Sequence, residues 1–459
     1  MKKLAILFGL GLVVSARLGA QATDTALQAV PLRETIVAAN RERENRDAVA
    51  QQVTVINQRL IAQANAQTSA DLLIQSGAAF VQKSQQGGGS PVLRGFEASR
   101  VLLVVDGVRM NNAIYRAGHL QNIVTLDNAM LDRVEVLYGP ASTVYGTDAL
   151  GGAVCFYTKN PELAAPGEKF RTTGSAFARY GTVNEEKTGH VDFSLGGERI
   201  GSLTSFTYSD FGDLRMGSQP GFEGKFGERY QYVERIDGRD SLVRNSDPLV
   251  QRFSGYKQYD ILQKILLKTG SNTTHVFNFQ YSTSSDVPRY DRLTDPGANG
   301  GLASAEWYYG PQNRLMAAYT LTVHDAGWFN DVDATLSWQD IDESRYNRNF
   351  GAPRRTAREE NVKVYGLTLN ANKRWERHTM LLGFDAQYND VTSKAFRTNV
   401  NTGEVTTQST RYPDGGSTML NLAAYATHQW RLADNNDWQF SEGLRVGYAA
   451  LEANFVSKE

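Results

Sequence analysis

The feature that most constrains the fold is a period-two alternation of apolar and polar residues over most of the chain. From about residue 165 onward, about eleven segments of roughly ten residues carry this pattern, the length expected of tilted membrane-spanning strands. In one segment the apolar face consists of Met380, Leu382, Phe384, Ala386 and Tyr388. The opposite face is mainly polar, with Asp385, Gln387 and Asn389. The alternation predicts β-strands that have one apolar and one polar face.

The links between these segments alternate in length. Short links fall near residues 196–199, 269–273, 325–328, 375–377 and 433–437. Long polar links fall near residues 211–255, 285–313, 346–361 and 392–416. An outer-membrane barrel has short periplasmic turns and longer extracellular loops, whereas a soluble β-sandwich has no reason to keep that order. Tryptophans near segment ends, such as Trp338, Trp375 and Trp430, are typical of barrel girdles. The pattern predicts an antiparallel transmembrane β-barrel.

The predicted barrel is incomplete in this sequence. A lumen wide enough for a domain of about 110 residues needs about 22 strands, and about eleven are visible. The sequence ends at residues 455–459, within what should be a strand. We therefore expect an N-terminal fragment with about half of its barrel. Because open strand edges are costly in lipid, we do not expect this fragment to insert stably by itself.

Charge and cysteine content exclude several classes of protein. The chain has 48 Lys and Arg residues against 49 Asp and Glu residues, so it lacks the positive field that nucleic-acid binding requires. Its single cysteine, Cys155, excludes a disulfide framework and a CxxC-type site. A basic start at Lys2 and Lys3, an apolar run and small residues up to Ala22 are typical of a secretory signal peptide over residues 1–22.

Two further regions precede the predicted barrel. Residues 23–50 are polar and charged, except for a β-prone patch formed by Glu34, Thr35, Ile36, Val37 and Ala38. By residue chemistry alone this patch is a solvated linker, with strand addition to a partner sheet as the alternative. Residues 51–160 have compact α+β character. Thr68 is a candidate helix cap there, and residues 101–105 form an apolar strand that ends at a turn.

Four motifs in the α+β region resemble the TonB-dependent outer-membrane receptor family. They are GSPVLRGF at 89–96, LVVDGVR at 103–109, RVEVLYGP at 133–140 and YGTDALGGA at 145–153. The resemblance implies an N-terminal plug inside a barrel of about 22 strands, in the outer membrane of a Gram-negative cell. The domains expected on this basis are a signal peptide (1–22), a periplasmic tail (23–50), a plug (51–160) and a partial barrel (161–459).

The resemblance also implies that Glu34–Ala38 is a TonB box, the segment that pairs with an inner-membrane-energised partner. Backbone pairing of this kind gives affinity with little demand on side chains. No nucleotide site is then needed, and neither GxxxxGK[ST] nor GxGxxG after a strand is present. HExxH and GxSxG are absent too, so no enzyme is expected. The expected partners are the TonB protein, outer-membrane lipid and a transported ligand, with no nucleic acid.

One loop bears on the cargo. The Gly118-His119-Leu120 step resembles haem and haemoglobin receptors of the family, and residues 286–293 resemble haemoglobin, transferrin and lactoferrin receptors. This resemblance implies that His119 binds haem iron. Neutral imidazole is a good axial ligand, and the phenolate of Tyr115 is an alternative. Arg116 is a candidate to pair with a haem propionate. Haem is then a transported ligand, and no intrinsic cofactor is expected.

Several functions remain open at this stage. The leading expectation is active uptake of haem, perhaps taken from haemoglobin. The alternative is a receptor for a ferric siderophore, cobalamin or another metal chelate, which would use aromatic and arginine contacts. A passive porin or an adhesin would need no TonB box. A single loop histidine such as His119 has the chemistry of an ordinary surface residue as well, and His190 is a weaker candidate ligand.

Overall fold

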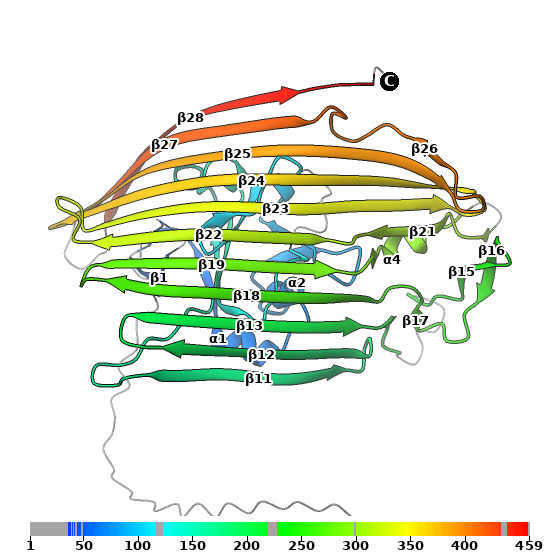
Figure 1. The fold of residues 1–459 in the computed structure, drawn as a ribbon, viewed down its shortest axis with the longest axis horizontal. Coiled ribbons are helices and arrows are strands. Elements are labelled where there is room, and N and C mark those ends of the chain that lie inside the picture. Colours follow the sequence, from blue (N-terminus) through cyan, green and yellow to red (C-terminus); the bar gives the residue numbers. More distant parts are fainter. Residues whose placement is uncertain are drawn as a thin grey trace, which may run out of the picture.

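The fold is a curved wall of long antiparallel strands with a smaller α+β unit packed against it (Figure 1). In this view the α+β unit, coloured blue to cyan, lies behind the wall. The computed structural model describes residues 35–37, 39, 41, 44–46, 49–115, 123–218, 227–297, 300–432 and 438–457.

The α+β unit, called the plug below, is built on a five-stranded sheet in the order β3-β9-β10-β7-β8. Strands β10 and β7 run parallel, and the other neighbours are antiparallel. The strands of the plug are β3 (Val53–Asn57), β4 (Phe80–Gln82), β5 (Ser90–Leu93), β6 (Phe96–Glu97), β7 (Val101–Val105), β8 (Val108–Arg109), β9 (Leu131–Tyr138) and β10 (Gly152–Thr158). Its helices are α1 (Gln58–Ala64), α2 (Ser69–Gln75) and α3 (Ser142–Tyr145), with 3-10 turns at Ala98–Arg100 and Thr147–Ala149.

The helix cap at Thr68 and the strand at 101–105, both predicted from local signals, are confirmed in the plug. The side chain of Thr68 caps α2 by accepting from the Asp71 N–H, which satisfies a donor that the first helical turn leaves open. The strand predicted at 101–105 is β7, and it ends at Asp106, whose φ of 48° suits a tight turn. Both elements therefore form for the local reasons given above.

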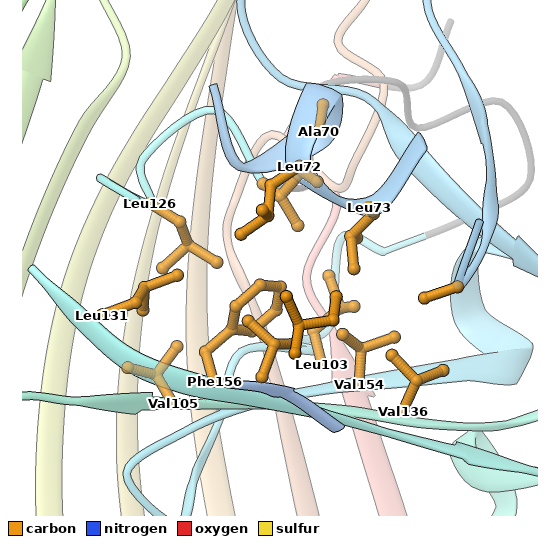
Figure 2. Close-up of a cluster of buried hydrophobic side chains, with 14 of the residues drawn as sticks. Ala70, Leu72, Leu73, Leu103, Val105, Leu126, Leu131, Val136, Val154 and Phe156 are labelled. Carbon is orange, nitrogen blue, oxygen red and sulfur yellow. The ribbon is translucent and has the colours of Figure 1, made fainter. Parts of the chain in front are cut away.

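The core of the plug lies between α2 and the sheet (Figure 2). Leu72 and Leu73 of α2 are fully buried and face Leu103 of β7 and Phe156 of β10 across this cluster. A fully buried side chain of this size stabilises a fold by roughly 1.5–3 kcal/mol relative to an exposed one. The plug therefore has a hydrophobic core of its own.

The wall contains eleven strands in one continuous antiparallel path among the described residues. In chain order they are β11 (Arg171–Gly181), β12 (Glu186–Gly196), β13 (Ile200–Phe211), β18 (Tyr256–Thr269), β19 (Thr273–Ser284), β22 (Asn313–His324), β23 (Asp331–Asn349), β24 (Arg354–Trp375), β25 (His378–Asn399), β27 (Ser417–Arg431) and β28 (Gln439–Ala453). The predicted alternation and strand order are confirmed.

The two faces of the wall are inverted relative to a soluble sheet. In β12, Val191 and Phe193 are each 44% exposed, whereas the alternating residues His190 and Asp192 are 5% and 7% exposed. The apolar side chains thus point away from the plug, and the polar side chains point toward it. A surface of this kind matches the lipid-facing band of an outer-membrane barrel. None of the helices that the structure describes is both long and apolar enough to span a bilayer.

Two of the predicted long loops are wrong in extent. Strand β23 has 19 residues, and β24 and β25 have 22 each, so the link expected at 346–361 is largely strand, and β25 takes up residues 392–399 of the link expected at 392–416. The chain between β23 and β24 turns within 350–353. Backbone pairing does not depend on side-chain polarity, and both faces of a ribbon that leaves the membrane meet water. The apolar half of the alternation disappears there, although the strands continue.

The outer loops contain short strands and a short helix. They are β14 (Leu214–Arg215), β15 (Gln231–Ile236), β16 (Arg239–Arg244), β17 (Val250–Gln251), β20 (Val287–Pro288), α4 (Tyr290–Leu293), β21 (Ser304–Tyr309) and β26 (Val405–Thr407). The guanidinium of Arg348, at the end of β23, donates two hydrogen bonds to Asp240 of the β15–β16 hairpin, at 2.6 and 2.9 Å. Arg348 also donates to Glu306 of β21 at 2.7 Å, so one side chain joins three loops.

Polar contacts seat the plug on the wall. Lys264 of β18, which is 2% exposed, lies 3.1 Å from Asp106 at the end of β7. Asn278 of β19 donates to the same carboxylate at 2.8 Å. On the plug, Gln86 donates to the carbonyl of Ser254 at 2.8 Å. Hydrogen bonds and ion pairs therefore hold the plug to the wall, in addition to apolar contacts of the plug core with Leu203 and Leu262 of the wall.

Candidate functional site: the docked N-terminal segment and the cavity behind it

The predicted TonB box is docked against the plug where the structure describes it. Strand β1 (Thr35–Ile36) pairs antiparallel with β2 (Glu44–Asn45). Ile36 is fully buried, and the Val37 N–H donates to the carboxylate of Glu135 at 2.8 Å. Glu34 and Ala38 lie outside the described residues. The interpretation of this patch as a solvated linker is wrong for Ile36, because tertiary packing supplies the buried site.

Arg41 ties this segment to the wall. Its guanidinium donates to Asp385 of β25 at 2.8 and 3.3 Å and to the hydroxyl of Tyr425 of β27 at 2.8 Å. It also lies over the ring of Tyr145, 4.7 Å from its centroid, as in a cation–π contact. Burial alone would lower the pKa of Arg41, but Asp385 and the two tyrosines outweigh burial and raise it. Arg41 is therefore a fixed cation at this position.

Asp385 is shared between the N-terminal segment and a cavity. Besides Arg41, it accepts from Arg445 of β28 at 3.0 Å and from Thr368 of β24 at 3.3 Å. Arg445 also donates to the carbonyl of Val144 in α3 at 3.1 Å. Asp385 and Arg445 both line the cavity described next. Asp385 therefore contacts Arg41 and lines the cavity at the same time.

A cavity of about 740 Å³ lies between the plug and strands β23–β28 of the wall. On β25 its lining runs from Asp385 to Asn389, a rise of about 13 Å along the strand. Its upper plug wall includes residues 111–113, where the Ala113 N–H donates to Asn389 at 3.1 Å. The cavity therefore extends from the level of Arg41 to the plug loop that contains residues 111–113. This loop is called the upper plug loop below.

Side chains with hydroxyl or amide groups form the largest class in the cavity lining, beside apolar residues such as Val364 and Leu422. From the plug the hydroxyl and amide residues are Ser99, Asn111, Asn112, Ser142, Thr143 and Thr147, and from the wall Thr335, Ser337, Gln339, Thr368, Gln387, Asn389 and Asn421. The charged groups are paired within the protein, Arg109 with Asp148 at 2.6 Å and Arg445 with Asp385. Such a lining hydrogen-bonds a hydrated or hydroxyl-rich solute and presents little unpaired charge to it.

The structure places one of the three predicted haem-binding residues. Tyr115 lines the cavity near its upper end, whereas His119 and Arg116 lie outside the described residues. Burial, together with nearby Glu343, raises the pKa of Tyr115 well above its usual value. Its phenol is therefore neutral here, and a phenolate ligand would require its surroundings to change. The neighbouring Ile114 anchors this loop in an apolar cluster with Val362 and Val391 of the wall.

His190 is not placed to bind a metal, so the interpretation of this residue as a weak ligand candidate is wrong. His190 lies in the middle of β12 and is buried. Both of its ring nitrogens contact protein oxygens, Thr207 at 2.7 Å and Asp192 at 2.9 Å. Neither nitrogen is therefore open to a metal. Within the described ranges, no group of three or more His, Cys, Asp or Glu side chains is arranged to hold a metal ion.

Sequence reasoning missed Arg41, Asp385 and Arg445. Arg41 was grouped with the charged run of the tail, and Asp385 was placed only on the polar face of its strand. The two residues are 344 positions apart, and no local pattern marks the pair. The one signal in the sequence is a polar residue on the inward face of the wall, such as Asp385. A polar residue buried there needs a hydrogen-bonding partner from the plug side.

Comparison with known proteins identifies the plug. A family described as the TonB-dependent Receptor Plug Domain matches residues 45–153. A hemin receptor from Yersinia pestis is 29% identical over 255 residues, which cover 51% of this chain and 36% of that protein. The vitamin B12 transporter BtuB from Vibrio vulnificus (strain CMCP6) is 28% identical over 241 residues, covering 50% of this chain and 38% of that protein. The aligned region thus spans little more than a third of these relatives.

Solved structures share the architecture. The copper transporter OprC superposes with a TM-score of 0.66 at 16% identity, covering 87% of this chain and 55% of that chain. The unliganded ferric citrate transporter FecA gives a TM-score of 0.62 at 15% identity, covering 91% of this chain and 59% of that chain. At this identity the likeness concerns the fold alone. The relatives named here are receptors or transporters and not enzymes. With a plug domain matched at residues 45–153 and an inverted β-wall, the chain is similar to TonB-dependent outer-membrane receptors.

Proposed function

We propose that the receptor formed by this chain imports a metal chelate, driven by a TonB-type partner that binds Glu34–Ala38. The observation that carries the proposal is the shared carboxylate of Asp385, which joins the cavity to the docked N-terminal segment through Arg41. Strand β1 is only two residues long, so a partner strand can displace it and pair with its backbone. Ligand occupancy and partner binding then act on the same contact.

Haem is the first candidate cargo, with a haemoglobin-like carrier as a candidate source. Its support is the Gly118-His119-Leu120 step, the residue types of Tyr115 and Arg116, and the similarity to the hemin receptor. Imidazole suits haem iron and a guanidinium suits a propionate. On this proposal His119 ligates the iron while Arg116 pairs with a propionate.

The test uses the complete receptor, purified in detergent, and hemin as the probe. We expect His119→Ala to weaken hemin binding at least tenfold and to slow growth of an iron-starved receptor-deletion strain supplied with hemin. The matched control is His275→Ala on β19, because His275 contacts Thr269 and Tyr319 within the wall. Unchanged hemin affinity in His119→Ala would remove this residue from the site.

A hydrophilic chelate is the second candidate, and the polar cavity favours it. A ferric siderophore or cobalamin presents hydroxyl, amide and carbonyl groups that the lining can hydrogen-bond. Growth of the same strain on hemin, on ferric siderophores and on cobalamin separates the candidates. Growth restored only by a siderophore or by cobalamin would replace haem as the cargo.

Energy coupling is tested separately from cargo. Deletion of residues 34–38 should abolish uptake while leaving ligand binding at the cell surface intact, because Arg41, which anchors the described part of the N-terminal segment, contacts Asp385, about 13 Å along β25 from Asn389 at the upper plug loop. A passive porin or an adhesin would retain flux or adhesion after this deletion. Uptake that survives the deletion would overturn the proposal of a TonB-driven receptor.

A further inference from the structure

A row of buried polar side chains crosses the boundary between plug and wall far from the cavity. It begins with Asp192 and His190 of β12, continues through Thr207 of β13 and ends at Asp127 of the plug. The three contacts measure 2.9 Å from Asp192 to His190 Nε2, 2.7 Å from His190 Nδ1 to Thr207, and 2.5 Å from Thr207 to Asp127. All four residues are less than 9% exposed.

Further charged groups surround this row. Asp192 also accepts from Lys159 at 2.7 Å and from Ser175 at 2.5 Å. Asp127 faces a second carboxylate, Asp260 of β18, which is also buried. Other titratable side chains in this region are Glu186 of β12, Arg179 of β11, which pairs with Glu186 at 2.7 Å, and Tyr256 of β18, which lies near Asp260, Glu186 and Asp71. The ring of Phe177 stacks on His190.

Counting hydrogens shows that the row needs one proton more than its parts supply. Three contacts between polar atoms at these distances require three hydrogens. With both Asp192 and Asp127 ionised, a neutral imidazole supplies one and the Thr207 hydroxyl supplies one. The third must sit on the other nitrogen of His190 or on Asp127. In either form the row holds one additional proton.

Loss of that proton removes the hydrogen bond between Thr207 of the wall and Asp127 of the plug. Asp192 is fixed as an anion by Lys159 and Ser175, so it holds the His190 Nε2–H toward itself. The deprotonated Nδ1 then accepts from the Thr207 hydroxyl. Thr207 has no second hydrogen for Asp127, and two acceptor oxygens face each other across the boundary. Asp127 keeps only the Ala129 N–H as a donor, at 2.9 Å, and it still faces Asp260.

We propose that His190 is a proton-dependent clasp that holds the plug segment 123–130 to the wall. With the additional proton bound, Thr207 donates to Asp127 and the segment is seated. Without it, Asp127 is an undersatisfied buried carboxylate beside Asp260, and the segment loosens. The clasp therefore weakens as the pH rises. It acts on the stretch that follows the upper plug loop in sequence, and it requires no particular cargo.

The test follows the mobility of the plug segment in the complete receptor, reconstituted in phospholipid vesicles. A nitroxide label at Ala129→Cys, which is half-buried, reports this segment by electron paramagnetic resonance. Between pH 5 and pH 9 we expect the ratio of mobile to immobile label to rise with pH, changing by up to about tenfold per pH unit as for one proton. A flat profile in the otherwise unchanged receptor would overturn the proposal.

Three substitutions identify the titrating group. His190→Gln should abolish the transition. Asp127→Asn should keep the label immobile at all pH values, because its amide supplies the third hydrogen to Thr207. Asp260→Asn should retain a transition, whereas loss of the transition there with persistence in His190→Gln would assign it to the carboxylate pair and refute the clasp. If His190→Gln does not fold, Asp260→Asn decides alone: a retained transition supports the clasp, and its loss refutes it.

A matched histidine serves as the control. His275 on β19 also contacts wall residues through both ring nitrogens, Thr269 at 2.8 Å and Tyr319 at 2.8 Å. His275→Gln should leave the pH profile of the label unchanged. Loss of the transition in His275→Gln would show that the label reports general loosening of the wall, and the proposal would fail.

Discussion

Removal of Arg41 should undock the N-terminal segment without unfolding the receptor. In Arg41→Ala the segment loses two hydrogen bonds to Asp385 and one to Tyr425. Breaking a buried ion pair commonly costs about 3–5 kcal/mol. Asp385 keeps Arg445 at 3.0 Å, so we expect about 1.5–3 kcal/mol, the range for a hydrogen bond to a charged group. Since 1.4 kcal/mol is tenfold, the undocking equilibrium should shift by about 10- to 150-fold.

Labelling near the segment measures this shift. A nitroxide at Arg46→Cys, in an exposed position close to β2, should gain a mobile spectral component in Arg41→Ala. Arg41→Lys should give a smaller gain, because an ammonium keeps the charge but cannot reproduce the forked contact. Arg59→Ala, on the exposed face of α1, is the control and should change nothing. An unchanged spectrum in Arg41→Ala would refute the view that this ion pair holds the segment.

Three further predictions concern the plug and the outer loops. Burial, with Glu135 nearby, raises the pKa of Cys155 to about 12. Only about one thiol in ten thousand is therefore ionised at pH 8, and alkylation by iodoacetamide should require unfolding. Rapid labelling of the folded receptor would contradict this prediction. Gly152→Ala should lower the free energy of unfolding of the plug by about 3 kcal/mol or more, because φ is 136° and a Cβ would lie 2.1 Å from a backbone oxygen. Gly167→Ala, also at positive φ but in open space, should cost only about 1–2 kcal/mol in the same denaturant titration. Burial alone would raise the pKa of Asp240, but its contacts with Arg348 and a backbone N–H outweigh burial and lower it. The loop contact therefore persists above the usual carboxyl pKa of about 4 and is lost as the pH falls through the lowered value. Cleavage of the outer loops by pepsin, which works in acid, should increase only below that point. Asp240→Asn should show increased tryptic cleavage at neutral pH.

Local physics accounts for what could be predicted from the sequence. The period-two alternation in residues 380–389 specifies a strand with unlike faces, because side chains alternate across any strand. Thr68 specifies a helix start, because its side chain accepts a hydrogen bond that the first turn needs. The motifs at 89–153 marked the plug. Each of these signals lies within about ten residues, and each was confirmed.

Strand length outside the membrane was not predictable in the same way. The extensions of β23, β24 and β25 carry polar residues on both faces, so the alternation that identifies a membrane strand is missing there. Their pairing rests on backbone hydrogen bonds, which leave no signature in side-chain polarity. The sequence therefore predicted loops where the structure has ribbons.

The sequence by itself determined the fold class, the inverted faces of the wall and the presence of a plug, because these follow from short-range periodicity and local motifs. Only the tertiary structure decided that Arg41 meets Asp385, that the cavity adjoins this pair, and that His190 lies in a proton-sharing row with Asp127. The contacts Thr207–Asp127 and Arg41–Asp385 join positions 80 and 344 residues apart. They depend on strand order and register and on the seating of the plug, which set distances that no local pattern encodes.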